Sequence, residues 1–514
     1  MKALCRVSKA ARTKGDETFS IHRMENLPVE LFQAVLTIIA LQDGNDYTTP
    51  RDPLRNLMNV SHVCSQWRAI ALQASEAWAA LHLDVHSTCT PWLEEILRRT
   101  RGQPLNISTT IVDNGRDYSS PQWVMTFNEF HRIETISIII EEVIPLEPLE
   151  KVLGQPAPLL RQFELKYDPD DYISDSFPEE MRLCPSGPLF ASHAPWLRAL
   201  ELNHCYIDLR CQAVSNLTAL LYVTTPQADD ARLHARQWGE ALSYMPNLEE
   251  LYLFFIADGP PCSVHVQLKK LRMLWLMGNH RNVQALYSGL DVPDICDTTL
   301  STTIDGTPEV FGEVGSLLVQ EAFNSLPYHH MAFKSTESAF SVGARHGNTK
   351  RCTKRSFTDS NLAPLREHYL SRLLRSLSRR GSLLASNTRI GLTALQLDFD
   401  VRYPDDPGDR EELCGDLAHF MSMFPRVESL ALGSPTIKTV IIPIFQQWPP
   451  TLWTEDEDLY RAAPILFPSL KELIAPVEVL EDDHMRAIVE SYALWRKDMG
   501  LPILVIYRDD VPIY

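Results

Sequence analysis

The side chains that could do chemistry in this sequence are few and stand apart from one another. His329 and His330 are adjacent, but no cysteine or spaced carboxylate pair accompanies them, as a zinc site would need. Asp398 and Asp400 follow a predicted strand and have the spacing of a carboxylate pair that could serve acid–base hydrolysis. Strand ends often carry such residues, so we expect no catalytic role for these aspartates. For the two histidines we expect a surface loop.

The ten cysteines are scattered along the chain, and none forms a CxxC pair. Cys205 and Cys211 are the closest pair, and their spacing is wider than in most zinc motifs. No lone cysteine has a fixed basic neighbour, so a thiol nucleophile has no support. Free thiols are typical of a reducing compartment, and we expect a cytoplasmic or nuclear protein.

The motifs of the common enzyme classes are missing. The sequence contains no Gly-rich phosphate loop, no HExxH and no G-x-S-x-G. A hydrolase within an α/β region stays an alternative, although no nucleophile is paired with a base. We therefore expect a non-catalytic protein that needs neither a metal nor another cofactor.

Composition narrows the class of partner. The 514 residues are 45% hydrophobic and 22% charged, as in ordinary globular proteins, and this length favours several domains. The net charge of −18 argues against binding to nucleic acid or to anionic lipid, because both need a concentrated basic surface. The longest apolar runs, such as 136–140 and 251–257, are far shorter than the ~20 residues of a membrane span.

A helical module is predicted near the N-terminus. Apolar residues recur with helical spacing at Leu31, Val35, Leu36, Ile38 and Ile39. Pro28 suits the first turn of this helix, where its missing N–H costs nothing. A polar break over 42–46 predicts a loop. A second helical run then puts one apolar stripe through Leu57, Val60, Cys64, Trp67 and Ala71.

This module has more apolar surface than so small a domain can bury. About fifty residues are marginal for independent stability. The helical domain predicted at 25–80 therefore needs cover from the next domain or from a second protein. Upstream, the first 15 residues carry five basic residues and no acidic one. We expect a disordered tail over 1–24, with an organelle transit peptide as the alternative.

Further along, the chain repeats one phrase, Leu-x-x-Leu-x-Leu or a close variant. Its members begin at Leu160, Leu197, Leu217, Leu248, Leu271, Leu392, Val427 and Leu470, with weaker ones at Trp78 and Ile133. The alternation within the phrase has the period of a strand with one buried face. Segments between phrases, such as 231–244 and 411–424, have helical composition.

Strand followed by helix at a recurring interval is typical of a leucine-rich-repeat solenoid with a parallel sheet. We predict this α/β fold for 81–514. The intervals are irregular, and a general α/β layer fold is the alternative. No clear phrase occurs between Leu276 and Leu392, and the stretch 297–365 is rich in Thr, Ser, Gly and Asn. We expect a flexible insertion at about 297–365.

The helical module resembles an F-box. The resemblance rests on Leu-Pro-x-Glu-Leu at 27–31, on Val60-x-x-Val63-Cys64-x-x-Trp67 and on Trp78. With irregular leucine-rich repeats behind it, the whole chain resembles fungal F-box proteins. It departs from that family in a longer stretch, 40–53, between the first two helices.

This resemblance implies a substrate-recognition adaptor of a Skp–cullin–F-box ubiquitin ligase. In that family the F-box binds the Skp-family linker and through it cullin, and the C-terminal domain captures a protein target for ubiquitin-dependent degradation. The positions that would form or support the linker interface are Leu27, Pro28, Leu31, Val35, Val60, Val63 and Trp67. Trp78 would pack the F-box on the next domain. The alternatives are that these residues form only the module's own core, and that the chain is a scaffold outside any ligase with F-box-like helices as its cap.

A target-binding patch is predicted on the open face of the sheet. Residues between the buried leucines of two neighbouring strands would gather there, namely Tyr252, Phe254, Met273, Trp275 and Met277. Solvent-facing apolar clusters are typical of binding sites, and methionine-rich ones adapt to varied partners. The alternative is that the insertion or a neighbouring loop covers this patch.

Overall fold

The structure is a computed structural model. It describes residues 28–40, 53–85, 88–111, 120–141, 147–167, 188–224, 233–293, 295–304, 330–335, 339–345, 352–359, 373–374, 376, 392–399, 416–433 and 467–508. The predicted tail at 1–24 and the predicted interface residue Leu27 lie outside these ranges. The chain divides into two units, residues 1–216 and 217–514, each taken by itself below.

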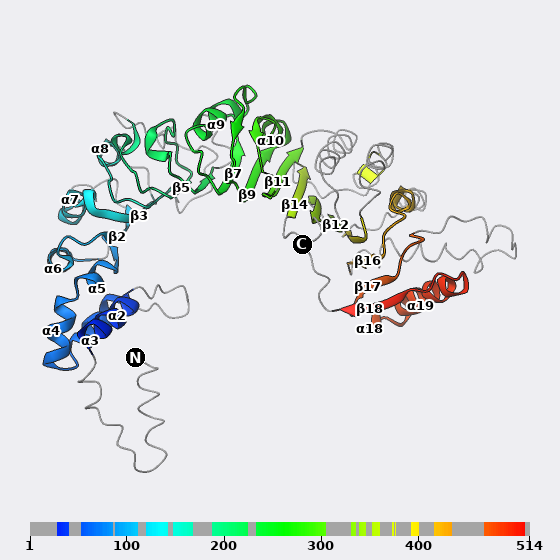
Figure 1. Cartoon of the computed structure of the whole chain (residues 1–514), viewed down its shortest axis with the longest axis horizontal. Helices are drawn as coiled ribbons and strands as arrows, with labels where there is room; N and C mark the ends of the chain where they lie inside the picture. The colour runs from blue at the N-terminus through cyan, green and yellow to red at the C-terminus, as the bar shows by residue number, and fades with distance from the viewer. Residues whose placement is uncertain are drawn as a thin grey trace, which may run out of the picture. The chain divides into compact units, whose positions relative to one another are not determined.

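The described part of the first unit starts with a group of helices and continues as strands that alternate with helices (Figure 1). Its helices are α2 (Val29–Ala40), α3 (Pro53–Ser61), α4 (Ser65–Gln73), α5 (Ser75–Ala79), α6 (Thr90–Thr100), α7 (Pro121–Asn128) and α8 (Glu147–Leu153), with 3-10 turns at Phe130–Arg132, Leu189–Ser192 and Gln212–Val214. Its strands are β1 (His82–Asp84), β2 (Leu105–Ile111), β3 (Ile133–Ile140), β4 (Gln162–Tyr167) and β5 (Ala199–Asn203). These strands pair in chain order, and every pair is parallel.

The second unit is built on a longer sheet. Its strands are β6 (Ala219–Val223), β7 (Glu250–Ile256), β9 (Met273–Asn279), β11 (Asp297–Ile304), β12 (His330–Ser335), β13 (Ala339–Arg345), β14 (Cys352–Asp359), β15 (Ala394–Phe399), β16 (Ser429–Leu432), β17 (Glu472–Pro476) and β18 (Leu504–Arg508). They lie in the order β6-β7-β9-β11-β14-β13-β12-β15-β16-β17-β18. The pairing is parallel except where β13 runs antiparallel to both of its neighbours.

The described helices that accompany this sheet include α9 (Ala235–Leu242), α10 (His280–Tyr287), α18 (Glu478–Glu481) and α19 (Asp483–Asp498). The short strands β8 (Val266–Gln267) and β10 (Leu290–Asp291) form a separate parallel pair. α10 packs on β9 and β11. The ring of Trp238 on α9 meets Tyr222 of β6 edge to face at 4.9 Å. Figure 1 shows α9 and α10 on one side of these strands.

Each of the ten leucine phrases overlaps a strand, which confirms an α/β fold with a large parallel sheet. The phrase that begins at Leu197 illustrates the cause. Leu197 is buried ahead of β5, and Leu200 and Leu202 are buried on one face of it. Leu202 pairs in register with Leu165 of β4. Successive phrases thus stack their apolar residues at the same height, and the hydrophobic effect favours that register.

The flexible insertion expected at 297–365 is a point where the structure differs from prediction. The described parts of this stretch form β11, β12, β13 and β14, within the sheet. In β11 the side chains of Thr298, Leu300, Thr302 and Ile304 are buried in strict alternation. Threonine is β-branched and fits a pleated, half-buried surface. The Thr-rich composition therefore belongs to a strand here and not to a loop.

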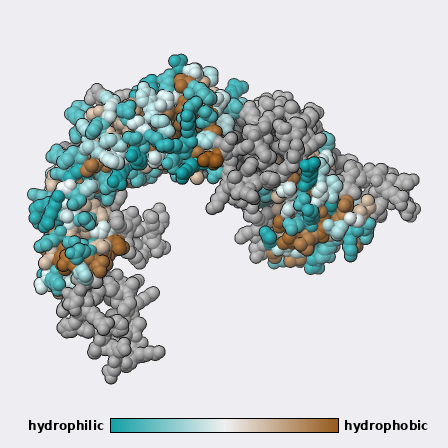
Figure 2. All heavy atoms as spheres, viewed as in Figure 1, coloured by the Kyte–Doolittle hydropathy of each residue, from teal (hydrophilic) through white to brown (hydrophobic). Residues whose placement is uncertain are grey.

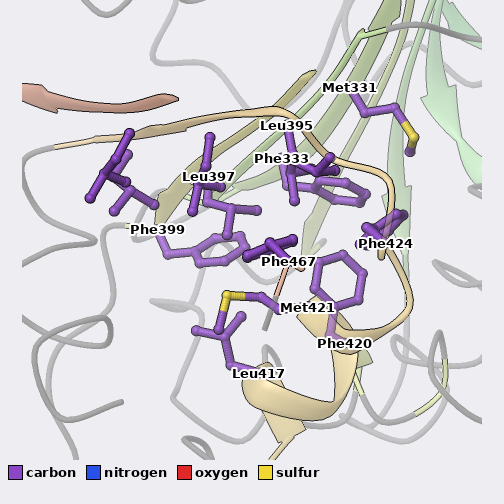
Figure 3. Packing of buried hydrophobic residues seen from close by; sticks show 14 of the residues in the cluster. Met331, Phe333, Leu395, Leu397, Phe399, Leu417, Phe420, Met421, Phe424 and Phe467 are labelled. Carbon is purple, nitrogen blue, oxygen red and sulfur yellow. The ribbon is translucent and has the colours of Figure 1, made fainter. Parts of the chain in front are cut away.

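The core of the second unit draws on these strands. Figure 3 shows Phe333 of β12 among Phe420, Phe424 and neighbouring apolar side chains. The rings of Phe333 and Phe420 meet edge to face with centroids 4.9 Å apart. Phe420 lies in a helical stretch over 416–422, within the segment predicted to be helical. A strand from the supposed insertion is therefore part of the core.

Candidate functional site

Helix α2 carries two apolar stripes, and the helices around it cover only one. Phe32, Leu36 and Ala40 are buried. In contrast, Leu31 is 56% exposed, Val35 45% and Ile38 59%. We call Leu31, Val35 and Ile38 the outer stripe of α2, since they recur with the spacing of one helical face. Figure 2 shows hydrophobic side chains at the surface over these N-terminal helices.

The inner side of α2 fixes the helix in place. α2 packs against α3, α4 and α5. The rings of Phe32 and Trp67 have centroids 4.7 Å apart. At the start of the helix, Phe32 N–H donates to the carbonyl of the exposed Pro28 over 3.1 Å. The outer stripe is therefore held by a packed helix while its own side chains face solvent.

The second helical run is broken between α3 and α4. The predicted continuous stripe stops at the turn 62–64, so only its two ends, Leu57 and Ala71, are buried. Val63 is 61% exposed in this turn. The next residue, Cys64, is exposed, and its Sγ accepts the N–H of Trp67 at 3.4 Å and so caps α4.

Trp78 connects the helical module to the next element of the same unit. Its ring is buried, and its Nε1–H donates to the carbonyl of Ala71 over 2.7 Å. The guanidinium of Arg99, on α6, lies 4.4 Å from the ring centroid. Arg98 and then Arg99 hold the pKa of Glu95 well below its usual range, at about 2. The ion pair between Arg99 and Glu95 helps fix the cation over Trp78.

The predicted linker-binding residues thus fall into three groups. Pro28, Leu31, Val35 and Val63 are exposed, Val60 and Trp67 are half-buried, and Leu27 lies outside the described residues. The structure brings Trp67 against α2 and leaves Val63 at the turn. It also adds Ile38, which the sequence reasoning did not include. The spacing Leu31, Val35, Ile38 was the signal that could have found it.

All five residues of the predicted target-binding patch are neighbours on one face of the second unit. We call Tyr252 and Phe254 on β7 with Met273, Trp275 and Met277 on β9 the β7–β9 patch. Tyr252 lies opposite Trp275, and Phe254 lies opposite Met277. The ring centroid of Trp275 is 6.3 Å from that of Tyr252 and 5.4 Å from that of Phe254.

Burial separates the two faces of these strands. Met273 is 39% exposed and Trp275 38%, and the other three patch residues are half-buried. The alternating leucines of β7 and β9, namely Leu251, Leu253, Leu274 and Leu276, are fully buried. Partial burial, with the charge of Glu250 adding to it, raises the pKa of Tyr252. Its hydroxyl therefore stays protonated, and it donates to Sδ of Met273.

The β7–β9 patch extends further than predicted. Leu221 of β6 lies opposite Tyr252 and is half-buried, as is Val223 on the same strand. The phrase that begins at Leu217 puts these two residues at the same repeat positions as Tyr252 and Phe254. That equivalence was the signal that could have found them.

A backbone irregularity limits the patch at the ends of the strands. Phe255 has a φ of 61°, and the register of β7 on β9 shifts at this point. Gly278, which lies opposite Ile256, has a φ of 151°, and a Cβ there would come within 3.1 Å of the Ile256 nitrogen. The close approach of the two strands at this bulge requires glycine.

The open face of the first unit has a different character. Its side chains on β2 and β3 include Ser108, Thr110 and Ser137, and on β4 Lys166 forms ion pairs with Glu164 and with Glu201 of β5. Polar groups that satisfy one another leave little free energy for a partner. The apolar β7–β9 patch is therefore the stronger candidate for a contact surface.

The residues considered for chemistry do not form a site. Lys334 Nζ lies 3.3 Å from the carboxylate of Asp398, while Asp400 and His329 lie outside the described residues. His330 begins β12, where a surface loop was expected. Within the described ranges, no cluster of three or more His, Cys, Asp or Glu side chains could hold a metal ion.

None of the helices in the described part of the chain has the length and apolar character needed to cross a membrane. Comparison with protein-family models and with curated proteins gives no match for this chain. The candidate site therefore rests on its geometry, which consists of two apolar surfaces that face solvent.

Proposed function

We propose that this protein is the substrate-recognition adaptor of a Skp–cullin–F-box ubiquitin ligase and acts in the cytoplasm or nucleus. The observation that carries the proposal is the outer stripe of α2. Leu31, Val35 and Ile38 face solvent on a helix whose inner side is fully packed. A second protein that covers this stripe would remove the apolar surface from water.

The physics of helix docking supports this assignment. An amphipathic helix binds a hydrophobic groove through anchors at i, i+4 and i+7, which is the spacing of the outer stripe. Burial of the exposed half of three aliphatic side chains contributes roughly 1 kcal/mol each, from about 25 cal/mol per Å². The exposed Val63 and Pro28 would add to the same contact. Such a contact suits a standard-size interface with an apolar centre.

The rest of the chain would present the target. We infer an irregular leucine-rich-repeat solenoid, because one phrase forms one strand and neighbouring phrase strands, such as β4 with β5 and β7 with β9, pair in parallel with their leucines in register. In such a fold the open face of the sheet is available for binding. The β7–β9 patch is the apolar part of that face, and aromatic and methionine side chains commonly anchor protein interfaces.

A scaffold capped by its N-terminal helices is the second candidate function. The observation in its favour is Trp78, which is buried and lies under Arg99 of α6, so the helices do cover the next element. A cap, however, needs only one apolar face. The outer stripe of α2 has no role in that alternative, and the adaptor accounts for it.

Affinity purification of the full chain from fungal cells distinguishes the two. The adaptor proposal expects the Skp-family linker and cullin among the bound proteins, and their loss with Leu31→Glu. The matched control is Leu494→Glu, since Leu494 on α19 is also an exposed helical leucine. Recovery of the chain without linker or cullin supports the scaffold alternative instead.

A further inference from the structure

The rim of the β7–β9 patch carries negative charge. Met273 lies opposite Glu250 of β7 on one side and opposite Asp297 of β11 on the other. Adjacent strands are about 4.8 Å apart, so the two carboxylate-bearing residues flank the methionine at a separation of about 10 Å. The side chain of Glu250 is exposed. A group that contacts Met273 therefore lies between two acidic residues.

The aromatic residues at the centre of the patch also favour a positively charged partner. Trp275 has Tyr252 and Phe254 as ring neighbours, with interplanar angles of 53° and 49°. The face of an aromatic ring attracts a cation, most strongly for tryptophan, and prefers arginine or lysine within about 6 Å. Trp275 is exposed, so an incoming side chain can reach it.

The basic residues near the β7–β9 patch limit the region that would attract a cation. Arg272 precedes β9 and lies 3.6 Å from the carboxylate of Glu249, which offsets its charge. Lys354 of β14 lies opposite Thr299, and Thr299 lies opposite Trp275. The cation is thus two strands away from the tryptophan, beyond the acidic residues. Across this face, the acidic and aromatic residues lie on β7, β9 and β11, and Lys354 follows on β14.

From this arrangement we propose that the β7–β9 patch binds a segment of the target in which arginine or lysine stands among apolar side chains. The apolar side chains contact Met273, Met277 and Phe254, and the cation lies between Trp275 and the Glu250–Asp297 rim. This inference rests on the proposed function, because it specifies the class of target for the same surface. Charge complementarity with a protein of net charge −18 also speeds the encounter.

Fluorescence anisotropy with the full chain tests the proposal. The probes are a labelled short peptide of alternating leucine and arginine and two counterparts with glutamine or glutamate in place of arginine. The arginine peptide is expected to bind at least tenfold more tightly than the glutamine peptide. Its affinity should exceed that of the glutamate peptide by a still larger factor. Equal binding of the three peptides, or no binding of the arginine peptide, overturns the proposal.

Two variants with matched controls locate the binding. Trp275→Ala is expected to weaken binding of the arginine peptide about tenfold or more, as the loss of an aromatic anchor does. Trp196→Ala removes another exposed tryptophan and is expected to have no effect. Glu250→Lys is expected to weaken binding of the arginine peptide severalfold. Glu481→Lys on α18 changes the net charge by the same amount and is expected to leave this binding unchanged. If Trp275→Ala and Glu250→Lys both match their controls, the general charge of the protein explains the binding and the proposal fails.

Failure here is distinguishable from failure of the adaptor proposal. The peptide titration contains no linker protein, and linker binding is measured separately on the same Trp275→Ala chain. That variant is expected to bind the linker as the unmodified chain does. Loss of linker binding on substitution of Trp275 contradicts the assignment of this patch to the target.

Discussion

The ring of Phe32 on α2 lies against the ring of Trp67 on α4, with centroids 4.7 Å apart and planes tilted by 56°. This contact, together with the packing of α2 on α3 and α5, determines which side of α2 faces inward. Phe32 is buried, and its sequence neighbour Leu31 is exposed. Two adjacent apolar residues thus lie in opposite environments, one inside the helical module and one facing solvent, where the proposed linker contact would form.

Substitution of these neighbours by alanine should separate the two roles. Phe32→Ala is expected to destabilise the helical module by about 3–5 kcal/mol, because it removes a buried ring. Leu31→Ala is expected to change stability by no more than about 0.5 kcal/mol, as exposed substitutions do. Native-state hydrogen exchange of α2 and α4 amides measures both. Similar losses of protection in the two variants contradict the assignment of Leu31 to the outer side.

Trp78→Phe should weaken the connection between α4, α5 and α6. The change removes the Nε1–H that donates to Ala71 over 2.7 Å and leaves a buried carbonyl without this donor. The Ala71 carbonyl still accepts the N–H of Ala74 at 3.4 Å. The expected cost is therefore that of one lost hydrogen bond, about 0.5–1.5 kcal/mol. Hydrogen exchange of the helical amides reports it, and Trp92→Phe on α6 is the control because Trp92 is exposed. A cost no greater than that of the control variant argues against a buried bond at Trp78.

The strand β11 gives a test of the region that composition assigned to a flexible insertion. Its amides are expected to exchange as slowly as those of β9, since β11 pairs with β9 along its length. Hydrogen exchange of the full chain, read on peptides that cover 297–304 and 273–279, makes the comparison. Complete exchange of 297–304 at the earliest time points, with 273–279 still protected, restores the insertion hypothesis.

The features that the sequence predicted correctly are those set by interactions between residues close together in the chain. The leucine phrases predicted strands well because period-two burial is local to each phrase. The orientation of α2 was harder to predict, since Phe32 and Leu31 are equally apolar and packing against the later helices α3, α4 and α5 determines which is covered. In β11, Thr298 and Thr302 were read as loop residues although both are buried in a strand. The break at 62–64 carries no glycine or proline, and the cap on α4 is the unusual residue Cys64.

Cys64 offers a footprint of the proposed linker contact. Cys64 and Cys89 are both exposed, whereas Cys205 is buried, and burial raises the pKa of the Cys205 thiol. Because a raised pKa keeps the thiol protonated, Cys205 should resist alkylation at mildly alkaline pH, and the exposed pair should react. Addition of the Skp-family linker is expected to slow alkylation at Cys64, next to Val63, and to leave Cys89 unchanged. Mass spectrometry of alkylated peptides gives both rates, and equal rates at Cys64 with and without linker count against a contact at this turn.

Titration calorimetry of the full chain with a purified Skp-family linker tests the central claim most directly. The proposal predicts one-to-one binding with a Kd of about 1 µM or tighter, as expected for an interface of standard size. Leu31→Glu should weaken it by about a hundredfold while the helix stays intact, because an acidic residue is favourable in the first turn of α2. Leu494→Glu should bind as the unmodified chain does. Absence of binding to the unmodified chain, or equal binding of the Leu31→Glu and Leu494→Glu chains, contradicts the account.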